Sequence, residues 1–227
     1  MYLIFEGFLL ITFIGMFFVF HTGSFAWMFL LKIMASLCFL MTGFCGYMKD
    51  SGRRTFSRPM FMALLCSMAG DVLLALGKKQ GILFVLGVAS FAGAHVLFSI
   101  AFCRVSAIAV EDMIGTLVVF GGLLLLLLSG PFAFHGIQPV LIGYGAVISF
   151  MTVKALSLWR CRKEGKSAAV LIMSGGVLFL LSDIVLLFWM FGIGMPRTVQ
   201  AANWILYYLA QGCLSASLSA KKQAGLK

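Results

Sequence analysis

Residues 168–190 read AAVLIMSGGVLFLLSDIVLLFWM, and Asp183 is the one charged residue among them. A segment of about 20 mostly apolar residues is long enough to cross the hydrocarbon core of a bilayer as a helix. An ionisable side chain is costly in that environment, so it is kept where it is paired or where it has a function. This part of the chain therefore predicts a transmembrane helix over 166–190 with a carboxylate inside it.

The rest of the chain has the same apolar character. Of its 227 residues, 62% are hydrophobic and 11% are charged, whereas a soluble domain is about half apolar and a quarter charged. Hydropathy and turn residues divide it into eight predicted helices, at 2–20, 25–48, 56–77, 81–104, 108–129, 136–160, 166–190 and 198–220. The predicted fold class is all-α, a polytopic membrane protein in which eight transmembrane helices form one domain over 1–227.

The lysines and arginines are divided unequally between the two ends of this predicted bundle. Twelve lie at the end that carries both termini, whereas three, Lys78, Lys79 and Arg197, lie at the opposite end. Positive residues are retained on the cytoplasmic side during insertion, so both termini are predicted to be cytoplasmic in a bacterial inner membrane. This distribution also accounts for the net charge of +10 without a nucleic-acid partner. Residues 2–20 lack a basic start, so we expect them to be a retained first span.

Four ionisable residues lie well inside the predicted helices: Lys32, Asp71, His95 and Asp183. The helices that carry the two aspartates run in the same direction, and each carboxylate lies about 10 Å from the same end. Lys32 lies at a comparable depth from that end. The uncharged polar residues that accompany them are Ser67, Ser182, Asn203, Tyr207, Tyr208 and Gln211. Together these residues predict one polar cavity in an apolar bundle, a site suited to an amphiphile.

Other interpretations of these residues remain open at this stage. His95 could form only a helix-to-helix hydrogen bond, and Lys32 could serve as a structural counter-ion. Glu6 and Lys154 are nearer to helix ends and are expected to reach the interface. The three histidines, His21, His95 and His135, have no zinc-binding spacing, so neither a metal site nor a cofactor is predicted.

Two further patterns concern packing and internal symmetry. The glycine pairs Gly121–Gly122 and Gly175–Gly176 are expected to let neighbouring helices approach closely. The segments SMAGDVLL at 67–74 and FLLSDIVL at 179–186 are similar, which suggests a four-plus-four helix repeat over 1–104 and 108–220.

Four motifs in this order resemble the YhhN-like integral membrane proteins, which include the lysoplasmalogenases. They are SMAGDVLL at 67–74, FAGAH at 91–95, GVLFLLSD at 176–183 and YYLAQ at 207–211. The resemblance covers nearly the whole chain from the second predicted helix onward. It implies hydrolysis of the vinyl ether bond of a lysoplasmalogen, a lysophospholipid, to a fatty aldehyde and glycerophosphoethanolamine or glycerophosphocholine.

The chemistry of that reaction suits two carboxylates. Vinyl ether hydrolysis needs an acid that protonates carbon and a base that accepts a proton from water. Our hypothesis is that Asp71 and Asp183 divide these roles, in an order that the sequence does not assign. Lys32 or His95 would keep one carboxylate ionised, and the polar residues near them would orient water or the headgroup.

Two other classes use the same residue types. Intramembrane Asp, Lys and His also form proton relays in transporters, but all four prolines lie near predicted helix ends, so no span is broken at its middle. A lipid-binding scaffold is the third class. It would have no catalytic activity for an aspartate substitution to reduce.

Overall fold

The structure is a computed structural model that describes residues 2–20, 25–50, 52–77, 81–134, 136–161 and 165–220. Within these ranges the chain is all-α apart from one isolated bridge between Phe132 and Gly192. Eight helices are described, and their ends differ from the predicted ones by at most three residues. They are α1 (Tyr2–Phe20), α2 (Phe25–Lys49), α3 (Arg54–Leu76), α4 (Ile82–Val105), α5 (Val110–Ser129), α6 (Gln138–Cys161), α7 (Lys166–Phe191) and α8 (Arg197–Ser217).

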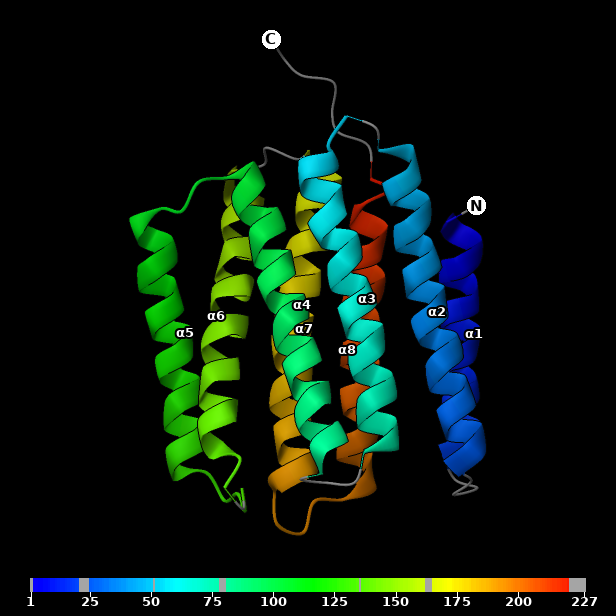
Figure 1. The fold of residues 1–227 in the computed structure, drawn as a ribbon, viewed down its shortest axis with the longest axis vertical. Helices are drawn as coiled ribbons and strands as arrows, with labels where there is room; N and C mark the ends of the chain where they lie inside the picture. The colour runs from blue at the N-terminus through cyan, green and yellow to red at the C-terminus, as the bar shows by residue number, and fades with distance from the viewer. Residues whose placement is uncertain are drawn as a thin grey trace.

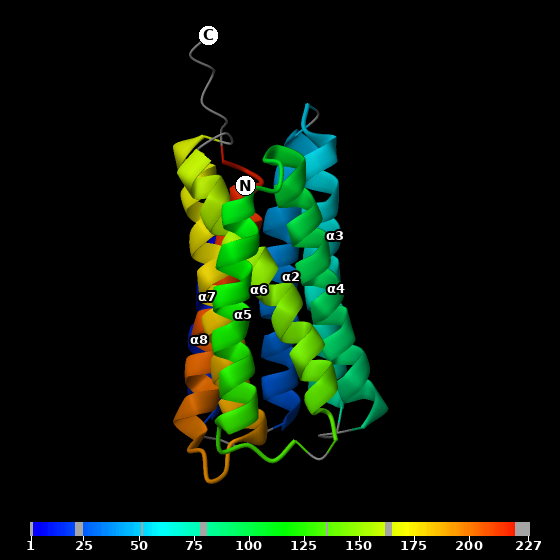
Figure 2. The same ribbon diagram turned by 90° about the vertical axis from the view of Figure 1, so that its left-hand side faces the viewer.

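Two helical hairpins, α3–α4 and α7–α8, are the most closely packed pairs in the bundle. They lie on opposite sides of α2 and α6 (Figures 1 and 2). α2 packs against α3 and α8, whereas α6 packs against α4 and α7. α1 and α5 lie at the two edges, and the start of α1 and the end of α8 are at the same end of the bundle (Figure 1).

The two halves of the chain pack in a matching way. Replacing each helix by the one four positions further along turns the α3–α4 hairpin into α7–α8. If the count continues from α8 to α1, the same replacement turns the contact of α2 with α8 into the contact of α6 with α4. The match is incomplete, because α1 also packs against α8 whereas the described residues of α5 make no contact with α4.

The two glycine pairs behave differently. A Cβ atom at Gly175 would lie 2.6 Å from the Leu214 side chain, and one at Gly176 would lie 2.8 Å from that of Ala155. These two glycines therefore let α7 approach both α8 and α6 closely, as predicted. Gly121 and Gly122 have no atom within 4 Å of such a Cβ, so the expectation of close packing there is wrong. They lie on the edge helix α5, on a face that no neighbouring helix covers.

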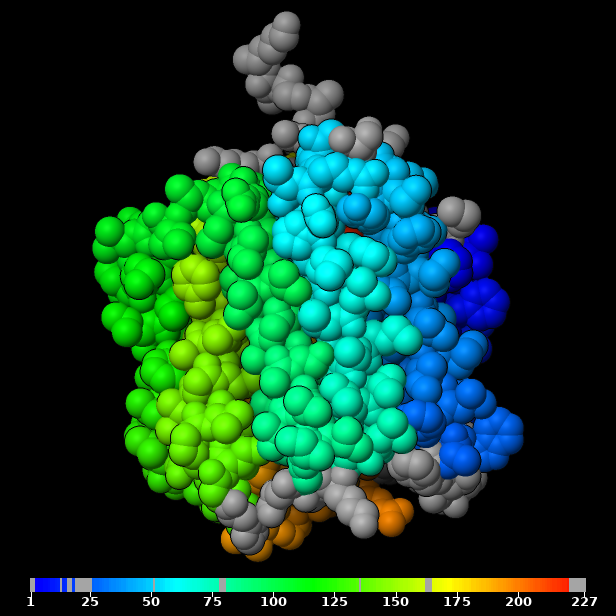
Figure 3. All heavy atoms as spheres, viewed as in Figure 1, coloured from blue at the N-terminus to red at the C-terminus, as the bar shows by residue number. Residues whose placement is uncertain are grey.

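The outer surface of the bundle is apolar. On α5, for example, Leu117 and Val118 are about 70% exposed, which suits contact with lipid. Side chains fill the spaces between the ribbons on the face formed by α2, α3, α4 and α6 (Figure 3). Among the described residues, six helices, α2 to α7, are long and apolar enough to cross a membrane. The hydropathy of α8 is lowered by four buried polar side chains, Asn203, Gln211, Ser215 and Ser217.

Candidate functional site

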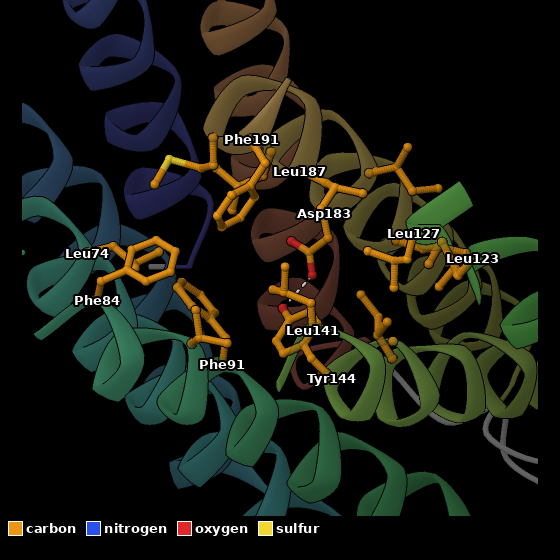
Figure 4. A pocket seen from close by; sticks show the side chains of 17 residues that line it. Leu74, Phe84, Phe91, Leu123, Leu127, Leu141, Tyr144, Asp183, Leu187 and Phe191 are labelled. Carbon is orange, nitrogen blue, oxygen red and sulfur yellow. Dashed lines mark hydrogen bonds between the residues drawn. The ribbon is translucent and has the colours of Figure 1, made fainter. Parts of the chain in front are cut away.

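An apolar pocket lies between α3, α4, α5, α6 and α7, towards the end of the bundle opposite the start of α1 (Figure 4). Counted together with its open mouth, it encloses about 710 Å³ of empty space. Leucine and phenylalanine side chains form most of its wall. Asp183 is the one charged residue that lines it, and Tyr144 provides its one hydroxyl. The pocket therefore has the composition of a site for a hydrocarbon chain, with one reactive wall.

Three polar side chains meet at that wall. The Tyr144 hydroxyl donates a hydrogen bond of 2.5 Å to Asp183 Oδ2 (Figure 4). His95 Nε2 lies 2.8 Å from the same hydroxyl and 3.4 Å from Asp183 Oδ2. A tyrosine hydroxyl has one proton, so when it donates to Asp183 its oxygen can accept from His95 Nε2–H. The result is a short hydrogen-bonded chain from a fully buried imidazole to the carboxylate in the pocket.

Asp71 lies in a second polar cluster, between α2, α3 and α8. Its Oδ2 accepts hydrogen bonds from the Ser36 hydroxyl at 2.6 Å and from the Tyr207 hydroxyl at 2.7 Å. Lys32 is close enough to interact electrostatically with this carboxylate. Tyr208 reaches the same region, where its hydroxyl is 3.5 Å from the Lys32 carbonyl oxygen. Asp71 is buried and is not among the residues that line the Asp183 pocket.

The two carboxylate clusters are joined by aromatic rings. The Tyr207 ring packs edge-on against Phe179 at 5.5 Å between centroids, and Phe179 packs edge-on against His95 at 4.6 Å. Contacts therefore run from Asp71 through these rings to Asp183. The sequence suggested one cavity for both aspartates, whereas the described hydrogen bonds form two clusters with no shared partner. The two aspartates lie at matching depths in their helices, but the Tyr207 and Phe179 rings lie between their clusters.

The two clusters follow the same plan. In each, a hydroxyl from the preceding helix donates to the aspartate: Ser36 on α2 to Asp71, and Tyr144 on α6 to Asp183. A ring from the fourth helix of the opposite half completes each cluster, Tyr207 on α8 in the first and His95 on α4 in the second. They differ in exposure: Asp183 lines the apolar pocket, whereas Asp71 is buried and does not line it.

The other predicted site residues have different surroundings. The Asn203 amide donates to both the carbonyl and the hydroxyl oxygen of Ser182, which links α8 to α7. Ser67 and Gln211 are fully buried beside the Asp71 cluster, and their side-chain polar atoms have no hydrogen-bond partner among the described residues. His21 and His135 lie outside the described residues.

Sequence reasoning missed two hydrogen-bond donors, Ser36 and Tyr144. A signal for Tyr144 was present, because it lies six residues into α6 at the same end of the bundle as Asp183. Ser36 lies one turn after Lys32 and so faces the same side of α2. Neither residue is charged at neutral pH, and isolated hydroxyls in apolar helices are common enough that depth alone did not select them.

A further buried ion pair corrects the expectation for Lys154. This side chain is fully buried, and its Nζ donates to Asp112 Oδ2 at 2.6 Å and to the Ala107 carbonyl at 2.7 Å. Lys154 therefore reaches the α4–α5 connection at the end of the bundle, where it is buried and ion-paired and not exposed. Lys154 links α6 to the start of α5 through Asp112, and to the segment before α5 through Ala107.

This architecture defines a class of protein: a multi-pass integral membrane protein with its polar centre inside the bundle. The family is shown by sequence. The profile of the YhhN family matches residues 11–218, so the chain belongs to that family. It is also 32% identical over 162 residues to lysoplasmalogenase TMEM86B of Sus scrofa. That alignment covers 69% of this chain and 62% of the length of the relative. No solved structure is significantly similar to the chain.

Proposed function

We propose that this protein is a lysoplasmalogenase, an enzyme that hydrolyses the vinyl ether bond of lysoplasmalogens. The observation that carries the proposal is the position of Asp183, the single carboxylate on the wall of an otherwise apolar pocket. The name of the pig relative supports the choice of reaction. An alkenyl chain would lie against the pocket's leucine and phenylalanine side chains, which are as apolar as the lipid that it leaves.

The reaction begins when a carboxylic acid donates its proton to the vinyl ether carbon that is not bonded to oxygen. The C=C electron pair forms the new C–H bond, and the positive charge is shared between the inner carbon and the ether oxygen. A carboxylate next to this oxocarbenium ion stabilises it and accepts a proton as water adds. The hemiacetal then breaks its C–O bond to the glycerol, which leaves as an alcohol while the aldehyde forms.

Asp71 and Asp183 are the two carboxylates in this proposal. Asp183 is the group that meets the lipid, because it lines the pocket and Asp71 does not. Tyr144 and His95 hold the Asp183 carboxylate in place by the hydrogen bonds described above. Asp71 is the second acid–base group in the proposal, and because it does not line the pocket, this role requires water or the vinyl ether to reach it past the Phe179 ring. Tyr207 is hydrogen-bonded to Asp71 and its ring contacts Phe179. A movement of side chains in one cluster would therefore displace side chains in the other.

The orientation in the membrane is also a proposal. The end of the bundle that carries Lys49 and Lys166 would face the cytoplasm, by the distribution of positive residues along the sequence. The pocket would then open towards the opposite side of a bacterial inner membrane. Cysteine labelling from either side of intact cells, at single positions in loops on each end, tests this assignment.

The test of function compares two lipids with the purified protein. Lysoplasmenylethanolamine should release fatty aldehyde, and its ester-linked counterpart should release neither aldehyde nor fatty acid. Asp71→Asn and Asp183→Asn should each lower turnover by at least about a hundredfold, the usual contribution of a general acid or base. Glu111→Gln is the matched control, because it neutralises an exposed carboxylate.

Two results would contradict the proposal. The first is turnover close to that of the unmodified protein in Asp183→Asn. The second is substrate-dependent proton movement in proteoliposomes without release of aldehyde, which would identify a proton-coupled transporter instead.

A further inference from the structure

Three buried polar side chains on the helices that form the Asp71 cluster lack hydrogen bonds of normal geometry with the described residues. They are Ser67 on α3, Thr42 on α2 and Gln211 on α8, and all three are fully buried. The side-chain polar atoms of all three form no hydrogen bond of normal geometry with the described residues, although Gln211 lies close to Tyr207 and Thr42 lies close to Glu6. Native proteins leave few such groups unpaired, and a buried water molecule is the usual partner.

Two of these side chains lie at one level in the bundle. Gln211 follows Tyr207 by four residues on α8, and Ser67 precedes Asp71 by four residues on α3. The two helices run in opposite directions, and the Tyr207 hydroxyl is bonded to Asp71. Gln211 and Ser67 therefore both lie about one helical turn from that hydrogen bond, towards the end where α1 starts.

The polar side chains continue in that direction to Glu6. Thr42 lies close enough to interact with the Glu6 carboxylate, and the Ser215 hydroxyl is 3.5 Å from Glu6 Oε1. A Cβ atom at position 212 would lie only 3.2 Å from Glu6 Oε2. Gly212 therefore makes room for this carboxylate directly beside Gln211.

Glu6 also lines an open groove between α1 and α8. Together with its mouth, this groove encloses about 770 Å³ of empty space, and Tyr208 and Gly212 form part of its wall. It lies in the half of the bundle where α1 starts, whereas the Asp183 pocket lies towards the opposite end. Most of the groove wall is apolar, and Glu6, near the start of α1, is the one charged residue among the described residues that line it, so water from the membrane surface would reach the polar column at Glu6.

We propose that the column formed by Glu6, Thr42, Gln211 and Ser67 binds a chain of water molecules that leads from this groove to Asp71. The inference rests on the proposed function, since that reaction consumes one water molecule for each vinyl ether. Gln211 offers two donors and an acceptor, and each hydroxyl offers both, which meets the two to four partners that a buried water needs. The lipid and the water would thus reach the two carboxylates from opposite ends of the bundle.

The first arm of the test is structural and is independent of activity. A structure of the protein in lipid nanodiscs, at a resolution that shows ordered water, should show density within hydrogen-bond distance of Gln211 and Ser67. Absence of density at both side chains overturns the proposal. Should the protein release no aldehyde at all, the proposed function fails, and this arm still decides whether the column binds water.

The second arm uses the kinetics of aldehyde release. Gln211→Met keeps the length of the side chain, and Ser67→Ala removes one hydroxyl. Each should lower kcat by about tenfold or more while KM for the lipid changes by less than about threefold, because water supply and not lipid binding is impaired. Gln211→Glu, which retains polar atoms, should restore part of the loss.

Ser149→Ala is the matched control for Ser67→Ala. Ser149 is equally buried, but its hydroxyl is bonded to the Gly145 carbonyl, so its removal should leave kcat unchanged. Unchanged kcat in both Gln211→Met and Ser67→Ala overturns the proposal, even when ordered water is present. Should Gln211→Met fail to fold, Ser67→Ala and the density in the unmodified protein decide the question.

Discussion

Removing one hydroxyl at the pocket wall gives a sharp test of the Asp183 cluster. Tyr144→Phe keeps the ring, which packs edge-on against His95 at 5.2 Å between centroids. It deletes the 2.5 Å hydrogen bond to Asp183 and the 2.8 Å contact with His95 Nε2. A hydrogen bond to a charged group contributes about 1.5–3 kcal/mol. If that stabilisation acts on the carboxylate in the transition state, turnover should fall by about 10- to 160-fold.

The assay is the initial rate of fatty aldehyde release from lysoplasmenylethanolamine in detergent micelles. Tyr47→Phe is the control, because Tyr47 stacks on Phe61 in the opposite half of the bundle and its hydroxyl is far from the pocket. We expect the control to retain full turnover. Full turnover in Tyr144→Phe, together with a large loss in Asp183→Asn, would refute the role given to the Tyr144 hydroxyl and leave Asp183 acting without it.

Three further predictions concern stability, packing and chain length. Asp112→Asn should cost about 3–5 kcal/mol of unfolding free energy in mixed micelles, because it leaves the Lys154 charge buried and unpaired. Adding Lys154→Met should recover most of that loss. Gly70→Ala places a Cβ atom 2.6 Å from the Phe91 ring and should cost about 1–3 kcal/mol by the same measurement. Leu187→Trp fills part of the Asp183 pocket and should raise KM more for long alkenyl chains than for short ones.

The two carboxylate clusters have similar hydrogen-bond partners but different surroundings. Each aspartate receives a hydroxyl from the preceding helix and a ring from the other half of the chain. In the first cluster Lys32 lies nearby and the surroundings are buried, while in the second the structure opens an apolar pocket. Similar geometry thus supports two different environments, which is what an acid–base pair with separate roles needs.

The sequence alone was sufficient for the helices. Each predicted helix is found within three residues of its predicted ends, because long apolar runs and polar breaks report directly on what a bilayer requires of a chain. It also identified Asp71 and Asp183 as residues that need an explanation, since an ionisable group is rare in such a segment.

Only the tertiary structure decided which side chains meet. The partners of Asp183, Tyr144 and His95, come from two other helices, and depth along the chain neither selected Tyr144 nor assigned His95 to Asp183 in preference to Asp71. Lys154 was expected at the interface, yet it pairs with Asp112, which lies 42 residues earlier in the chain. Periodicity fixes the depth and the face of a residue, but the rotation and spacing of neighbouring helices are set by packing at contacts such as Gly175 against Leu214. Those contacts, made between distant segments, determine where a carboxylate is buried and where it borders a pocket.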